Sequence, residues 1–392
     1  MGDLYRQVGD FASLANLLEG WAGRSQDARR AAQALIQAGE LIAGHLGDPQ
    51  RARQLYEQAL ARDAHAIQAL DGLLALVEGQ DPAATLDLLR RRGSLQQHHG
   101  DHQGLADTEY RIGHLYEGDY ARPDKAIAHY RKAFEADPGL VPAIYAAREI
   151  YRKAGNHKAA ATLFELEVKA EQSQERRVAL LRELAQIRRE QLNDDAGAIE
   201  ALTRAEREAG HDLGVLHELA TVLLQRADKR GTGKAADDDR RKAADLMVRI
   251  AEEVPVDHAL VYCESALDAW PAQERAMELL EHLARESSQE ERLPGRWVAY
   301  LSTAPEGPGA DERRKRLGLA YLEAGQGDDA IVCLEPLLER GDAQAAHALI
   351  DLYRERGRED DALRATSMAL DSLPMGERLP HLRELRLRLH AR

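Results

Sequence analysis

The chain has 392 residues, of which 44% are hydrophobic and 31% charged, and its formal net charge at pH 7 is −14. This apolar content excludes a fully disordered chain, and the negative charge argues against nucleic acid as the main partner, because phosphate binding needs clustered Lys and Arg. The two cysteines form no CxxC pair, and no apolar run approaches the roughly 18 residues of a membrane span.

The chain begins with "MGDLYRQVGDF", which lacks the basic and apolar regions of a signal peptide. We therefore expect a cytoplasmic protein, and the excess of Arg over Lys is typical of a GC-rich bacterial genome. Tyr5, Gly9 and Asp10 are the residue types expected at the end of one helix and the following turn, so the chain enters its repeat halfway. A half repeat leaves a face uncovered. This favours a segment of a larger repeat protein, and the alternative is that the face packs on another molecule.

A pattern of small, large and small residues recurs along the chain. Ala52, Tyr56 and Ala59 show it first, and the stretch "IAHYRKAFEADP" repeats it and ends with a proline. The same offsets recur from Ala198, Ala259, Ala330 and Ala362. Another small residue, such as Gly39 or Gly113, stands about 13 residues before the first alanine of the pattern.

These offsets have a physical reason. Residues with this spacing share one face of a helix, small residues let a neighbouring helix approach, and the large residue fills the groove between helices. Proline cannot continue a helix and therefore ends the unit. Each unit is thus a helix–turn–helix pair that must stack on copies of itself to bury its apolar face.

The pattern resembles the tetratricopeptide repeat (TPR) family over nearly the whole chain. The resemblance implies an all-α fold, a right-handed α-solenoid of antiparallel helix pairs, with roughly nine repeats plus partial terminal repeats. The residues that carry the signature are Gly39, Ala52, Tyr56, Ala59, Gly113, Tyr116, Ala126, Tyr130, Ala133, Pro138, Gly318, Tyr321, Ala330, Ala362 and Pro374.

Breaks in the pattern suggest a division of the chain. Residues 1–228 form an N-terminal array in which two unequal repeats alternate, and residues 240–392 form a C-terminal array that is irregular at 287–311. Between them, "KRGTGKAADDD" at 229–239 has no apolar residue larger than Ala, which predicts an exposed insertion loop. Its glycines lack the P-loop spacing. The last residues, 376–392, are expected to form an amphipathic helix that covers the end of the array.

Candidate chemistry is sparse. His98, His99 and His102 are competent metal ligands, but they stand in an expected turn with no Cys or Glu beside them, so we expect a polar loop and no metal. The stretch "HELAT" lacks the second His of a zinc protease motif. We expect no catalytic residue and no cofactor.

The resemblance to the TPR family implies that the first helices line a concave groove that binds an extended peptide. The Lys and Asn residues of the family's carboxylate clamp are not found at the matching positions. Tyr, Arg and His residues stand there instead, and Tyr and Arg often dominate binding energy. The expected partner-binding residues are Tyr110, Arg111, His114, Tyr145, Glu149, Arg152, Arg182, Gln186, Arg189 and His217.

The sequence therefore predicts a non-enzymatic scaffold or adaptor with a protein or peptide partner. One alternative is a recruiting or regulatory segment of a larger enzyme or signalling protein. Another alternative is a helical-repeat RNA binder. The net charge of −14 and the lack of a base-reading pair of residues in each repeat argue against it.

Overall fold

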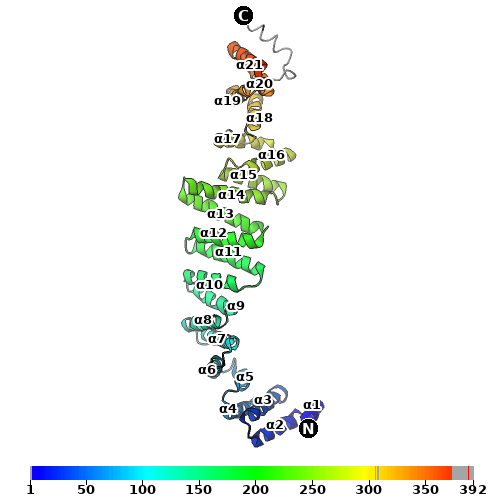
Figure 1. Ribbon diagram of the computed structural model, residues 1–392, viewed down its shortest axis with the longest axis vertical. Helices are drawn as coiled ribbons and strands as arrows, with labels where there is room; N and C mark the ends of the chain where they lie inside the picture. Colours follow the sequence, from blue (N-terminus) through cyan, green and yellow to red (C-terminus); the bar gives the residue numbers. More distant parts are fainter. Residues whose placement is uncertain (1, 305, 307–308, 373–386, 388–392) are drawn as a thin grey trace. The chain divides into compact units, whose positions relative to one another are not determined.

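The computed structural model describes residues 2–304, 306, 309–372 and 387, and every regular element within them is a helix (Figure 1). The chain divides into two compact units, Met1–Ala209 and Gly210–Arg392. The predicted all-α architecture of antiparallel helix pairs is confirmed. Pro374 and the helix expected at 376–392 lie outside the described residues, apart from Leu387.

In the first unit, consecutive helices pack against each other in pairs, and each pair packs on the next. The helices are α1 (Gly2–Val8), α2 (Phe11–Arg24), α3 (Ala28–Leu41), the π-helical turn η1 (Ile42–Leu46), α4 (Pro49–Arg62), α5 (Ile67–Val77), α6 (Pro82–His99), α7 (His102–Glu117), α8 (Pro123–Ala136), α9 (Val141–Lys153), α10 (His157–Ala170), α11 (Gln174–Glu190) and α12 (Asp195–Ala209).

Aspartate side chains start many of these helices. The carboxylate of Asp10 accepts a hydrogen bond of 3.0 Å from the Ser13 N–H, and Asp101 accepts one of 2.9 Å from the Gly104 N–H. Asp27, Asp48 and Asp81 begin α3, α4 and α6 in the same way. Each cap satisfies a backbone donor that the first helical turn leaves without a partner.

The core of the first unit is built on close contacts between glycine and tyrosine. Tyr56 of α4 is only 3% exposed, and its ring lies between Gly39 of α3 and Gly72 of α5. A Cβ atom would come within 2.6 Å of the ring at Gly39 and within 2.4 Å at Gly72. The second helix of one pair is therefore wedged between two first helices, which fixes how each pair stacks on the next.

The second unit contains the remaining helices. They are α13 (Leu213–Arg230), α14 (Lys234–Ala251), α15 (Val256–Ala269), α16 (Glu274–Glu286), the 3₁₀ turn η2 (Glu290–Arg292), α17 (Leu293–Thr303), α18 (Ala310–Glu323), α19 (Gly327–Glu339), α20 (Ala343–Glu355) and α21 (Glu359–Ser372).

The predicted loop at 229–239 is wrong for most of its length. Only residues 231–233 separate α13 from α14, and Asp239 is 2% exposed. Arg226 donates two hydrogen bonds to the Asp239 carboxylate, at 2.8 and 2.6 Å, and Arg230 donates a third at 2.8 Å. A polar stretch thus folds as helix because its one buried carboxylate is fully paired by arginines of the preceding helix.

Helix pairing changes within the second unit. α14 packs against α13, α15 and α16, and α19 packs against α18, α20 and α21. In the α18–α19 pair the small residue is Gly318, where a Cβ would lie 2.6 Å from Cγ of Leu334. The sequence between 287 and 311 contains the 3₁₀ turn η2 and the short helix α17, which is where the regular pattern is weakest.

Candidate functional site

The ten residues expected to bind a partner all lie on first helices. Nine stand on α7, α9 and α11 of the first unit, and His217 stands on α13 of the second. Within α9 and α11 their spacing places them on one side of the helix. The contacts around them differ from helix to helix.

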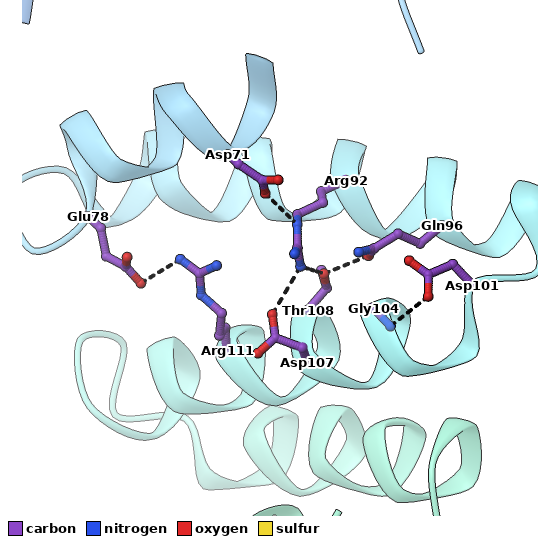
Figure 2. A network of polar contacts seen from close by, with 9 residues as sticks. All are labelled: Asp71, Glu78, Arg92, Gln96, Asp101, Gly104, Asp107, Thr108 and Arg111. Carbon is purple, nitrogen blue, oxygen red and sulfur yellow. Dashed lines mark hydrogen bonds and ion pairs between the residues drawn. The ribbon is translucent and has the colours of Figure 1, made fainter. Parts of the chain in front are cut away.

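On α7, the expected residues are mostly engaged within the chain. The half-buried ring of Tyr110 lies 5.6 Å from that of Tyr130 and 5.9 Å from that of His114, measured between ring centroids. Arg111 forms an ion pair of 2.8 Å with Glu78 at the end of α5 (Figure 2). His114 is exposed. The expected residues of α7 therefore offer one exposed imidazole, which packs on the Tyr110 ring, beside two side chains that hold helices together.

Figure 2 also shows a polar network beside this pair, which the sequence did not predict. Arg92 of α6 donates a hydrogen bond of 2.8 Å to Asp71 of α5 and one of 3.1 Å to Asp107 of α7. It also donates to Thr108, whose hydroxyl donates a 2.7 Å hydrogen bond to Gln96. The network ties three successive helices through one arginine, so we assign it a structural role.

On α9, the structure places an exposed aromatic ring over a buried cation. Tyr145 is 45% exposed, and the guanidinium carbon of Arg148 lies 4.9 Å from its ring centroid. Arg148 is itself 2% exposed and stacks at 3.9 Å on the ring of Phe164 of α10. One face of the Tyr145 ring thus packs on the guanidinium of Arg148, and the packing of Arg148 on Phe164 fixes the position of that guanidinium.

Three carboxylates surround Arg148. Its closest ion pair is with Glu167 of α10 at 3.0 Å, and Glu149 and Glu183 each lie at 3.5 Å. Glu167 is 1% exposed, and its burial raises the pKa of its carboxyl, because one guanidinium shared by three acids does not offset the loss of hydration. Arg148, Glu167 and Glu183 were missed by the sequence analysis. No spacing distinguishes them from the many other Glu and Arg residues.

The other expected residues form short-range ion pairs and hydrogen bonds. Arg152 donates hydrogen bonds of 3.0 and 2.7 Å to Glu149, one turn earlier on α9. On α11, Gln186 donates a 3.2 Å hydrogen bond to Glu190, and Arg189 donates one of 2.9 Å to the same carboxylate. Arg182 is half-buried. His217 stands in the second unit, where the hydroxyl of Tyr262 lies 3.3 Å from its Nδ1.

The histidine-rich segment contains a different cluster from the one considered in the sequence. The rings of His98 and His99 lie 5.6 Å apart, and the third ring beside them is that of His65, not His102, which begins α7. Within the described residues, no group of three or more His, Cys, Asp or Glu side chains is arranged to hold a metal ion.

Three grooves lie in the first unit, between α2 and α6. One of about 340 Å³ lies between α3 and α5, and another of about 650 Å³ is lined by α2 and α3, with Trp21 and Gln33 among its residues. A third, of about 520 Å³, is lined by α4, α5 and α6. These grooves lie in residues 2–91 and include none of the ten expected residues. No helix of the described part of the chain is long and apolar enough to cross a membrane.

No protein-family model and no curated protein matches the chain. Solved structures do. A crystal structure of MamA is 22% identical, with a TM-score of 0.34, over 43% of this chain and 94% of that one. YrrB, described as a TPR protein with an unusual peptide-binding site, is 17% identical, with a TM-score of 0.24, over 57% of this chain and 96% of that one.

A tetratricopeptide repeat protein from Parabacteroides merdae is 15% identical, with a TM-score of 0.34, over 72% of this chain and 95% of that one. At these identities the likeness concerns the fold alone. Independently of it, antiparallel helix pairs repeat along both units, and small first-helix residues receive large second-helix side chains in the α3–α4, α7–α8 and α18–α19 pairs. Because this packing repeats along the chain, the chain has a TPR-like fold.

Proposed function

We propose that this protein is a non-enzymatic interaction scaffold that binds a peptide or a segment of a partner protein along the first helices of its first unit. The proposed surface is made by α7, α9 and α11. One observation carries it: Tyr145 exposes 45% of its surface while the buried Arg148 supports its ring from beneath.

An exposed tyrosine is a favourable anchor for a partner. Its ring supplies a large contact area at a small cost in side-chain entropy, and its hydroxyl remains available for a hydrogen bond. Because Arg148 already restrains the ring, less freedom is lost on binding than for an isolated surface side chain. The exposed Arg152 and the half-buried Glu149 lie on the same side of α9 and supply charged groups of both signs around the ring.

The test is a pull-down with the full chain as bait, followed by mass spectrometry and by affinity measurement with the peptide that is identified. A residue that anchors a partner costs about 2 kcal/mol or more on truncation, so Tyr145→Ala should weaken binding by roughly 30-fold. Tyr145→Phe keeps the ring over Arg148 and should lose far less. Arg182→Ala, on the neighbouring first helix α11, should also weaken capture.

Tyr120→Ala is the matched control, because Tyr120 is also exposed but lies between α7 and α8, away from the proposed surface. Circular dichroism of each variant establishes that the helices remain folded. If Tyr145→Ala and Arg182→Ala both capture the partner as well as the wild type does, the assignment of this surface is wrong.

A further inference from the structure

Three imidazole rings meet at one end of helices α5 and α6. His65 stands just before α5, and His98 and His99 are the last residues of α6. The ring centroids of His65 lie 6.3 Å from His98 and 5.8 Å from His99. All three side chains are exposed, so solvent protons reach each ring directly.

His65 also belongs to the groove between the first helices α3 and α5. The groove has a volume of about 340 Å³, and its floor includes the buried residues Ile36 and Ala66. Gln33 of α3 and Gln68 of α5 line it from opposite sides. Their amides both donate and accept hydrogen bonds, which suits the peptide groups of an extended chain.

The charges that line this groove are few. Arg29 of α3 is exposed, and within the described residues it has no ion pair or hydrogen bond from its side chain. The one carboxylate in the lining is that of Asp63, which accepts a 3.0 Å hydrogen bond from the backbone N–H of His65. Asp101 follows the His98–His99 pair, and its carboxylate caps α7 by accepting a hydrogen bond from the Gly104 N–H (Figure 2).

This composition makes the charge of the groove depend on pH. Histidine is the side chain that gains its charge between pH 8 and pH 5. With neutral imidazoles, Arg29 and Asp63 balance each other in the lining, whereas protonation of the three rings adds up to three positive charges, of which the Asp101 carboxylate offsets at most one. Rings about 6 Å apart can all contact one bound anion, which attracts each proton that they take up. Anion binding and proton uptake therefore favour each other.

We propose that the groove between α3 and α5 is a second peptide site, which binds an acidic segment and does so more tightly as His65, His98 and His99 become protonated. The glutamine amides, on opposite sides of a groove of about 340 Å³, favour a peptide over a small inorganic anion, which would leave most of the groove unfilled. The site is separate from the Tyr145 surface, so an experiment can refute one of the two proposals and leave the other standing.

The experiment measures binding of a fluorescein-labelled hexaglutamate peptide to the full chain by anisotropy at about pH 7.5 and about pH 6, where the Glu side chains remain ionised. We expect at least about a tenfold gain in affinity at the lower pH, the size of one good charged contact. Calorimetry in buffers of different ionisation enthalpy should show proton uptake on binding. Inorganic phosphate in the millimolar range should compete only weakly.

The triple variant with His65→Gln, His98→Gln and His99→Gln should lose the pH dependence and the proton uptake. Arg29→Gln should weaken binding at both pH values. His282→Gln, an exposed histidine of the second unit, is the matched control and should behave as the wild type.

Three outcomes would overturn the proposal. One is that the peptide does not bind at either pH, and another is that the pH dependence survives in the triple variant. The third is that binding requires an added divalent metal and disappears with a chelator, in which case the imidazoles serve as ligands. Loss of binding on Tyr145→Ala would instead show that the peptide uses the first surface.

Discussion

The ring of Tyr130 lies directly against Gly113, in the space that any side chain on that residue would occupy. A Cβ on Gly113 would come within 2.6 Å of both Cδ1 and Cε1 of the ring, and Tyr130 is fully buried. The hydroxyl of Tyr130 donates a 2.7 Å hydrogen bond to Glu117, so the ring is held at both ends and cannot move aside cheaply. Burial raises the pKa of this tyrosine, and Glu117 adds to the effect.

Gly113→Ala should therefore destabilise the first unit, although alanine is the better helix former by about 1 kcal/mol. Forcing an extra methyl group into a filled site costs about 1–3 kcal/mol, and here it meets a ring that is fixed by Glu117. We expect a net loss of up to about 2 kcal/mol in urea unfolding. Gly23→Ala is the control, because a Cβ there meets nothing within 4 Å. Equal stability of the two variants would contradict the packing described.

The stability contributed by Glu167 should depend on pH. Its pKa is raised by burial, so the folded state holds the proton more strongly than the unfolded chain, whose carboxyl titrates at about pH 4.3. The contribution is fully present below that value and is lost as the pH rises through the folded pKa. Relative to Glu167→Gln, the wild type should thus lose free energy of unfolding as the pH rises above about 4.3 and through the folded-state pKa.

Urea unfolding at several pH values measures this difference. Glu135→Gln is the control, since Glu135 is exposed and pairs with Arg131, one turn earlier on α8. Parallel curves for the wild type and Glu167→Gln would mean that the carboxyl of Glu167 is as well stabilised when folded as in water.

In the second unit, Arg313 should contribute more to stability than the other arginines of α18. It is 3% exposed and donates hydrogen bonds to Glu281 at 2.7 Å and to Glu274 at 2.8 Å, while stacking on Tyr300. Glu281 also accepts a 2.8 Å hydrogen bond from the indole of Trp297. Breaking such a pair leaves a buried charge without its partner.

Arg313→Leu should therefore cost about 3–5 kcal/mol in chemical denaturation. The control, Arg316→Leu, removes a half-buried arginine that pairs with Glu312 on the same helix, and it should change stability by less than about 0.5 kcal/mol. Similar losses for both variants would show that the Arg313 network contributes no more than a surface ion pair.

The two cysteines should differ in reactivity. Burial raises the pKa of the Cys263 thiol to about 12, and its side chain is fully buried in α15. Cys333 is half-buried, and its pKa is also raised, first by burial. The thiolate is the reactive form, so Cys263 stays unreactive in the folded protein at pH 8. A disulfide-exchange reagent should label Cys333 slowly in the native state and Cys263 only in denaturant. Cys333→Ser should therefore remove the labelling seen in the native state.

Much of the local architecture was predictable. The small and large residues at helical spacing predicted antiparallel helix pairs, and Gly39, Gly113 and Gly318 do receive a large side chain of the following helix. The prediction failed at 229–239, because hydrophobicity alone cannot show that Arg226 and Arg230 bury the carboxylate of Asp239. The ten expected surface residues remain a prediction.

Outside residues 229–239, the sequence by itself determined where most helices lie and which faces they bury, because helical periodicity and side-chain size act over one or two turns of a single chain segment. Only the tertiary structure decided which polar side chains come together. Arg148 meets Glu167 and Glu183 from two other helices, and His65 meets His98 and His99 across a helix pair. These contacts depend on the angle and register at which pairs stack, and the buried contact of Tyr56 with Gly39 and Gly72 sets that register.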